Sequence, residues 1–139
     1  MHLSLQWILL FFFQIESENL APYTKPGLYQ ITCLKTKKVY IGESANVLSR
    51  VSRHSRSLQS KRHDCAEMQA DYNIYGLEQF TFHVLLFGSE WADAEKRKEK
   101  ETEILRSYPQ NQLYNVHPDA TKQSSKNYRV CCVLLGIVF

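Results

Sequence analysis

Two side chains on one stretch of the chain have the types and the spacing that phosphate chemistry uses. Arg50 and His54 are an i, i+4 pair, so on a helix they lie on the same face, one turn apart. Arginine is always charged, and its planar guanidinium can bind a phosphate through two hydrogen bonds. Val47 and Val51 recur beside the pair at helical spacing, which places the pair at the edge of a buried stripe, where side chains line a cleft. The alternative is a surface position for each residue, and a single histidine is more often structural than catalytic.

A carboxylate later in the chain adds a possible metal ligand. Three glutamates compete for this role: Glu99, Glu101 and Glu103. Helical geometry places Glu101 on the same stripe as Leu105, whereas the other two project to roughly the opposite side. A carboxylate on an apolar stripe is costly to bury without a partner or a metal ion. An ion pair with Arg97, one turn earlier, is the alternative to a divalent cation.

Two tyrosines and two glycines form a paired pattern near the start of the chain. Gly27-Leu28-Tyr29 is followed, after ten intervening residues, by Tyr40-Ile41-Gly42. On a β-hairpin this separation brings both tyrosines toward one end of the sheet. Tyrosine is common in strands, so a buried aromatic pair is the structural alternative. The glycines weaken that alternative, because glycine is poor in strands unless a turn or a close backbone approach requires it.

The ordered combination of these motifs resembles the GIY-YIG nuclease family, with Leu28 in place of the usual isoleucine. The stretch from His63 to Gly76 is similar to the middle segment of the family, and a glutamate on the long helix precedes the pair Tyr114-Asn115. The pattern is closest to that of the intron-encoded homing endonucleases. The other family positions follow in order along the chain: Arg50, His54, His63, Glu101 and Asn115.

The resemblance implies a metal-dependent endonuclease that hydrolyses phosphodiester bonds in DNA. Tyr29 would take the proton of the attacking water, and Tyr40 and His54 would assist it. Arg50 would stabilise charge on the phosphoryl oxygens, and Glu101 would hold a divalent cation, Mg²⁺ with Mn²⁺ as a substitute. A tyrosine with an ordinary pKa of about 10 is a poor base at neutral pH, so we expect nearby positive charge to help it. The implied supporting residues are Gly27, Gly42, His63 and Asn115.

Basic residues gather in one part of the chain, although the formal net charge is only +3. Between residues 35 and 62 eight lysines and arginines face a single acid, Glu43. Such a zone is the electrostatic footprint expected of a phosphate-facing surface. The resemblance implies that its partner is double-stranded DNA, and a solvated basic face is the alternative. The residues expected to contact DNA are Lys37, Lys38, Arg53, Arg56, Lys61 and Arg62.

These groups must be positioned by a small α/β (α+β) domain, in which about three helices flank a short three-stranded antiparallel sheet. Alternating residues and turn signals predict strands over 28–34, 39–41 and 80–87, with Gly42 ending the second strand. A first helix is expected after a cap at Ser44 or Asn46, with Val47, Val51 and Leu58 on its buried side. Further helices are predicted over 65–74 and 92–108, followed by a short extended segment over 113–116.

The chain has 139 residues, of which 44% are hydrophobic and 22% charged, as in a single globular domain. We expect the nuclease domain to cover 25–118, with an apolar extension over 1–24 outside the core and a linker and apolar tail over 119–139. The apolar run 3–13 is too short to span a bilayer as a helix and makes a weak signal peptide. A buried strand, an interfacial segment or sequence foreign to the domain are all open for it, and no membrane partner is expected.

The remaining features leave the biological role open. Four cysteines without a Cys-x-x-Cys pair or zinc spacing favour a reducing compartment, either an organelle that encodes the protein or a phage or bacterial cytoplasm. The oligomeric state and the target site are not indicated. Few residues follow position 118, so we expect low specificity or a truncated frame, as in a reading frame lodged within an intron. A repair or restriction nuclease and a catalytically inactive DNA-binding remnant are the alternatives to a homing endonuclease.

Overall fold

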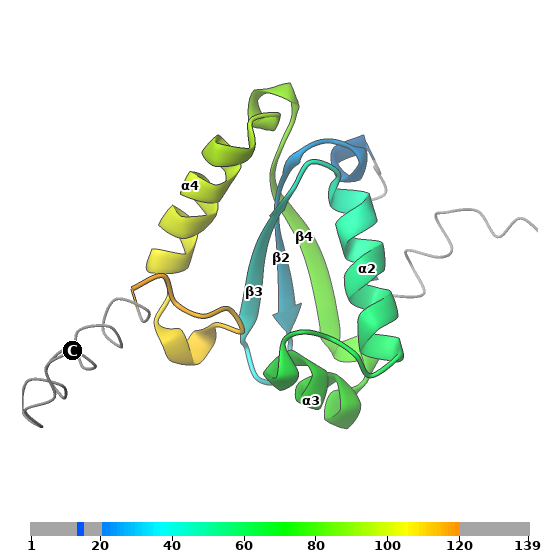
Figure 1. Ribbon diagram of the computed structural model, residues 1–139. Coiled ribbons are helices and arrows are strands. Elements are labelled where there is room, and N and C mark those ends of the chain that lie inside the picture. Colours follow the sequence, from blue (N-terminus) through cyan, green and yellow to red (C-terminus); the bar gives the residue numbers. More distant parts are fainter. Residues whose placement is uncertain (1–13, 16–20, 120–139) are drawn as a thin grey trace, which may run out of the picture.

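The computed structural model describes residues 14–15 and 21–119, which form an α+β domain around one sheet (Figure 1). The strand order is β1-β4-β2-β3. The strands are β1 (Gln14–Ile15), β2 (Gly27–Cys33), β3 (Val39–Ser44) and β4 (Phe80–Phe87), and the helices are α2 (Val47–Gln59), α3 (Ala66–Tyr75) and α4 (Ala94–Arg106). Short 3₁₀ turns cover Ala21–Thr24, Leu77–Gln79, Ser89–Trp91 and Gln110–Gln112.

The predicted antiparallel sheet is confirmed, since β2 pairs antiparallel with both β3 and β4. The prediction that Gly42 ends the second strand is wrong, because β3 continues to Ser44. Gly42 pairs with Tyr29 across the hairpin, and a Cβ on Gly42 would stand 2.4 Å from the Tyr29 hydroxyl oxygen. The glycine therefore makes room for the tyrosine ring instead of breaking the strand.

The first glycine has a comparable role on the other side of β2. A Cβ on Gly27 would stand 2.0 Å from the main-chain oxygen of Leu86 in β4. The register between these strands shifts between Leu28 and Tyr29, which is a β-bulge. Both glycines are thus required by close approaches, as the paired pattern predicted.

Helices cover both faces of the sheet (Figure 1), and buried apolar residues form two separate clusters. On one face α2 and α3 pack against Tyr29, and the predicted stripe of Val47, Val51 and Leu58 is fully buried there. On the opposite face Leu105 of α4 packs against Ile41 of β3. Because side chains alternate along a strand, Tyr29 and Tyr40 both face α2, whereas Ile41 faces α4.

Helix caps set the helix starts. Of the two candidate caps for α2, Asn46 accepts the hydrogen bond, from the main-chain N–H of Ser49 at 3.0 Å. Asp93 caps α4 by accepting from the N–H of Lys96 at 2.9 Å. The long helix consequently begins at Ala94, two residues later than predicted, and a 3₁₀ turn precedes it.

The buried core includes residues before position 25, where we expected the domain to begin. Tyr23 is 3% exposed, and its ring packs against Phe82 at a centroid distance of 5.5 Å. The short strand Gln14–Ile15 pairs in parallel with β4 at the edge of the sheet. The expectations for 3–13 and for most of 119–139 lie outside the described residues. Within the described part of the chain, no helix is long and apolar enough to cross a membrane.

Candidate active site

Three side chains and one main-chain amide form a continuous chain of hydrogen bonds on the α2 face of the sheet. The Tyr29 hydroxyl lies 2.7 Å from Nε2 of His54. Nδ1 of His54 lies 2.8 Å from Nε2 of His63, and Nδ1 of His63 accepts the main-chain N–H of Cys65 at 3.1 Å. The tyrosine comes from β2, His54 from α2, and His63 from the loop between α2 and α3, so the fold joins residues that are far apart in the sequence.

Tyr29 is fully buried, and its surroundings act on its hydroxyl in opposite directions. Burial raises the pKa of Tyr29 and the neighbouring Tyr40 hydroxyl raises it further, whereas the Arg50 guanidinium lowers this pKa. Burial also raises the pKa of Tyr40. Positive charge is therefore present beside Tyr29, as we expected, but the cost of burying a phenolate outweighs it.

Both histidines of this hydrogen-bond chain, His54 and His63, are in the neutral form. Burial, followed by the charges of His63 and Arg50, lowers the pKa of His54 to about 3. Burial also lowers the pKa of His63. At neutral pH each ring therefore carries one proton, and its two nitrogens are one donor and one acceptor.

Arg50 lies half-buried on α2, one turn before His54, as its spacing predicted. Its Nε atom is buried and has no hydrogen-bond partner among the described residues. Hydrogen bonding to Tyr29 is the largest cause of the raised pKa of Arg50. A buried guanidinium nitrogen without an acceptor is costly, so it suits an anionic oxygen brought by a substrate.

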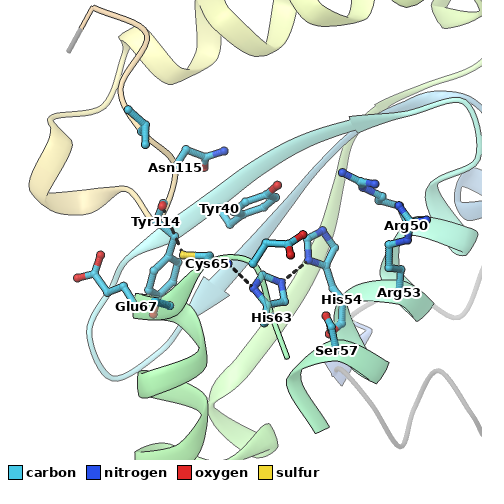
Figure 2. A pocket seen from close by; sticks show the side chains of 13 residues that line it. Tyr40, Arg50, Arg53, His54, Ser57, His63, Cys65, Glu67, Tyr114 and Asn115 are labelled. Carbon is cyan, nitrogen blue, oxygen red and sulfur yellow. Dashed lines mark hydrogen bonds between the residues drawn. The ribbon is translucent and has the colours of Figure 1, made fainter. Parts of the chain in front are cut away.

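Tyr40, Arg50, His54 and His63 line a pocket with a volume of about 520 Å³ (Figure 2), whereas Tyr29 and Glu101 are not among its lining residues. Figure 2 shows the Tyr40 hydroxyl and the Arg50 side chain pointing toward each other above the His54–His63 pair. Arg53, expected from the sequence as a DNA contact, also lines the pocket. The remaining wall comes from the start of α3 and from residues 114–116.

Glu101 is the inward-facing glutamate of α4, as helical geometry predicted. Its side chain is half-buried, whereas Glu99 and Glu103 are exposed. Burial, followed by the charge of Glu43, raises the pKa of Glu101 to about 7, and Arg50 opposes this rise. The described residues make no hydrogen bond or ion pair to its carboxylate that would neutralise it.

The alternative ion pair between Glu101 and Arg97 is not formed. Arg97 is 5% exposed, and its Nε donates to the Glu43 carboxylate at 2.6 Å. Its Nη1 donates to the main-chain oxygens of Trp91 and Ala92, each at 2.8 Å. Arg97 therefore binds Glu43 and two main-chain oxygens, and the half-buried Glu101 has no ion-pair partner among the described residues.

The donor set fits a hard divalent cation held by one carboxylate and several waters. Among the described residues, no group of three His, Cys, Asp or Glu side chains could hold a metal ion alone. That excludes a closed zinc-type cage in this part of the chain. Glu101 is the residue that would hold the cation, which would relieve the cost of its buried charge.

Asn115 contacts the free edge of β3 beside the second glycine motif. Its Oδ1 accepts the main-chain N–H of Ile41 at 2.8 Å, and its Nδ2 donates to the Ile41 oxygen at 2.8 Å. The neighbouring Tyr114 donates its hydroxyl to Asp71 of α3 at 2.6 Å. Asn115 thus binds the strand that carries Tyr40, and it does not reach Glu101 by a hydrogen bond.

The structure divides the basic residues expected to contact DNA. Arg53 lines the pocket with Arg50. Lys38 is half-buried and forms an ion pair with Glu67 at the pocket rim. The other four are exposed outside the pocket, Lys37 on the β2–β3 turn and the rest in the second half of α2 or directly after it: Lys37, Arg56, Lys61 and Arg62.

Comparison with known proteins identifies this arrangement. The sequence profile of the GIY-YIG catalytic domain matches residues 25–115, which hold the site described above. The chain belongs to the GIY-YIG nuclease family. It is therefore an endonuclease, a hydrolase of phosphodiester bonds in DNA, in a family that generally depends on divalent metal ions.

Solved structures support the GIY-YIG fold. The catalytic domain of the homing endonuclease I-TevI superimposes with a TM-score of 0.59 at 24% identity, covering 66% of this chain and 98% of that one. A point mutant of the catalytic domain of the intron endonuclease I-TevI gives a TM-score of 0.58 at 24% identity, covering 66% and 92%. No curated protein matches the sequence.

Sequence analysis missed several residues around this GIY-YIG site. Glu43 was counted only as the lone acid in a basic zone, but it pairs with Arg97 and raises the pKa of Glu101. Cys65 contributes its main-chain N–H to His63, for which side-chain chemistry offers no signal. Gln69 holds the His63 loop through two main-chain hydrogen bonds, and only its place in the middle segment pointed to it.

Proposed function

We propose that this chain is a divalent-metal-dependent endonuclease that cuts double-stranded DNA, with Mg²⁺ as its cofactor and a homing role like that of intron-encoded endonucleases. One observation carries the proposal. The buried Nε of Arg50 has no hydrogen-bond partner among the described residues, and the Arg50 side chain lines the pocket. Glu101, from the helix on the opposite face of the sheet, is half-buried and supplies a carboxylate for a cation, and its charge raises the pKa of Tyr29 and Tyr40.

Each residue has a distinct task in the proposed reaction. Arg50 binds the scissile phosphate and stabilises the charge that develops on its oxygens. Tyr29, as phenolate, accepts the proton of the attacking water, and Tyr40 lies beside it across the hairpin at a ring distance of 6.4 Å. A cation bound at Glu101 supplies Lewis-acid stabilisation of the phosphoryl and leaving oxygens.

The fold supports the proposed homing role, and the exposed basic residues support duplex DNA as the substrate. The proposed homing role rests on the likeness in fold to the catalytic domain of the homing endonuclease I-TevI. The exposed basic residues on α2 and after it suit a duplex backbone that runs past the pocket mouth. The buried Nε of Arg50 has no hydrogen-bond partner among the described residues, and an unused donor of this kind favours an active site over a catalytically inactive remnant.

Cleavage of supercoiled plasmid tests the proposed function. We expect nicked and linear products with Mg²⁺ or Mn²⁺ and none in excess EDTA, because Glu101 alone cannot stabilise the leaving oxygen. Ca²⁺ should bind without turnover. Cleavage that persists in excess EDTA would contradict the metal-dependent mechanism.

Binding of duplex DNA should weaken steeply as salt rises, because the exposed basic residues release counterions from the backbone. Replacing Arg56, Lys61 or Arg62 by alanine should each lower the slope of log affinity against log salt by about 1 for each lost phosphate contact. Lys38→Ala is the matched control, because Lys38 is paired with Glu67 and should change the slope less. Filter binding between low and physiological salt measures this, and a flat affinity would refute the basic surface.

A further inference from the structure

We propose that the main-chain N–H of Cys65 sets the direction of the hydrogen-bond chain through His63 and His54, so that His54 donates to Tyr29 and cannot take its proton. We propose further that Gln69 is the positioning residue that holds His63 in this chain. The inference rests on the proposed function for its catalytic meaning, but the direction of the chain is a property of the folded protein alone.

The direction of these hydrogen bonds follows from the main-chain N–H of Cys65, which can only donate. A main-chain N–H is always a donor, and the N–H of Cys65 meets Nδ1 of His63 at 3.1 Å. Nδ1 of His63 must therefore present a lone pair. A neutral imidazole carries one N–H, so the His63 proton is on Nε2.

The same argument passes along the chain to the tyrosine. Nε2–H of His63 points at Nδ1 of His54 across 2.8 Å, so that nitrogen is the acceptor. The proton of His54 is then on Nε2, which lies 2.7 Å from the Tyr29 hydroxyl oxygen. If the direction were reversed, the N–H of Cys65 would point at a second N–H, on Nδ1 of His63. A second proton on His63 would create the same clash. A second proton on His54 would place two N–H groups against each other between His54 and His63.

The charged groups around the chain favour this neutral state. The groups that act on Tyr29 are Tyr40 from β3, Arg50 and His54 from α2 and, from the opposite face of the sheet, the charge of Glu101. The two arginines near His54, Arg50 and Arg53, disfavour a cationic ring. Burial, the largest cause, and Arg50 lower the pKa of His63, whereas the backbone hydrogen bond at Cys65 and the charge of Asp64 raise it, with burial outweighing them.

Gln69 of α3 fixes the loop that carries His63. Its Oε1 accepts the main-chain N–H of His63 at 3.1 Å, and its Nε2 donates to the main-chain oxygen of Leu58 near the end of α2 at 2.9 Å. One side chain therefore joins the His63 backbone to the helix that carries His54. The two imidazole rings stack at 5.1 Å with an interplanar angle of 27°, an alignment that a displaced loop would lose.

The direction of the chain has a consequence for the reaction. Nε2 of His54 already carries a proton, so Tyr29 must release its own proton to solvent by a route other than His54. The resulting phenolate then accepts hydrogen bonds from His54 and Arg50. Because burial raises the pKa of Tyr29, Tyr29 is mostly protonated at neutral pH, and the phenolate fraction rises about tenfold per pH unit below that pKa.

Nitrogen-15 NMR of the full-length, metal-free protein with labelled histidine tests the direction without DNA. We expect His54 and His63 both to be in the Nε2–H tautomer at pH 7 and His54 to remain neutral to about pH 5, with the signals assigned by their loss in His54→Gln and His63→Gln. His117, which does not line the pocket, is the internal control outside the hydrogen-bond chain. An Nδ1–H tautomer on His54, or its titration near pH 6.5, would overturn the proposal.

Gln69→Ala tests the positioning role, with Asn73→Ala as the matched control. Asn73 contacts the same Gln69 amide at 3.1 Å but is exposed and does not touch His63. We expect Gln69→Ala to mix the His54 tautomers and to slow single-turnover cleavage about 10- to 100-fold at unchanged DNA affinity, and Asn73→Ala to change neither. Unchanged tautomers in Gln69→Ala would overturn the role of Gln69. Intact tautomers without any cleavage by the parent protein would refute the proposed function and leave the direction of the chain standing.

Discussion

Glu101→Gln is expected to abolish metal-dependent cleavage while the domain stays folded. The glutamine keeps the size and shape of the side chain but removes the charge that a hard cation requires. Burial and the charge of Glu43 raise the pKa of the half-buried Glu101 to about 7. A bound cation would offset the cost of this partly buried charge, which glutamine does not carry. We expect a loss of at least about a hundredfold in single-turnover rate with Mg²⁺.

Two neighbouring glutamates provide matched controls for this prediction. Glu99 and Glu103 lie on the same helix but are exposed, and Glu103 is paired with Lys100 at 2.8 Å. Glu99→Gln and Glu103→Gln should keep most of the cleavage activity. Equal losses in all three variants would mean that α4 contributes general charge and not a metal ligand.

Thermal unfolding separates metal binding from catalysis at Glu101. A ligand that binds only the folded state stabilises it by about 2.7 kcal/mol at a hundred times its dissociation constant. Mg²⁺ should therefore raise the Tm of the parent protein but not that of Glu101→Gln. A magnesium-dependent rise in both proteins would place the cation on other ligands.

Arg50→Ala is expected to bind DNA nearly as well as the parent and to cut it at least about a hundredfold more slowly. A residue that only steers DNA contributes equally to the ground and transition states, so its loss raises KM and spares kcat. Arg50 instead holds a buried Nε without a partner beside the Tyr29 hydroxyl, where charge develops. Removing one such donor typically costs roughly 10²–10³ in kcat, or about 3–4 kcal/mol.

Arg50 also acts on Tyr29, and the loss of this effect should lower the cleavage rate as well. Its guanidinium lowers the pKa of Tyr29 against the effect of burial, so its removal leaves less phenolate at a given pH. Arg50→Lys should recover little, because an ammonium cannot reproduce the planar fork. The pH dependence of the rate in Arg50→Ala should consequently lie at higher pH than in the parent.

Arg56→Ala is the control for Arg50, because Arg56 lies on the same helix, is exposed and does not line the pocket. It should weaken DNA binding modestly at a near-normal single-turnover rate. Arg53, which lines the pocket, is unsuitable as a control. Filter binding beside single-turnover plasmid cleavage measures each variant. If Arg50→Ala loses affinity and keeps its rate at saturating protein, Arg50 is a binding residue and the site must be reassigned.

The sequence by itself determined the elements and the inward-facing residues of this GIY-YIG nuclease. Strand alternation, helical periodicity and caps are local properties of the chain, which is why Val47, Val51 and Leu58 were correctly placed in the core. The same local geometry selected Glu101 from three glutamates, because the direction of a helical side chain depends only on its spacing from its neighbours. The order of the motifs was sufficient to identify the family.

The tertiary structure alone decided how these residues act on one another. Gly42 could not be recognised as a strand residue from its own propensity, because the tyrosine ring that requires it lies across the hairpin. The partner of Arg97 is Glu43, which is 54 positions away in the chain, and not the carboxylate one turn along the helix. Such pairings depend on which elements pack together, and spacing within one helix carries no information about them.

The balance at Tyr29 is likewise a tertiary property. Positive charge near the phenol was expected from the sequence, but the depth at which the ring is buried determines that desolvation outweighs it. The direction of the histidine chain depends on the main-chain N–H of Cys65, a group that every residue except proline carries. Only its position against Nδ1 of His63 gives it a role, and that position exists once the loop between α2 and α3 has folded.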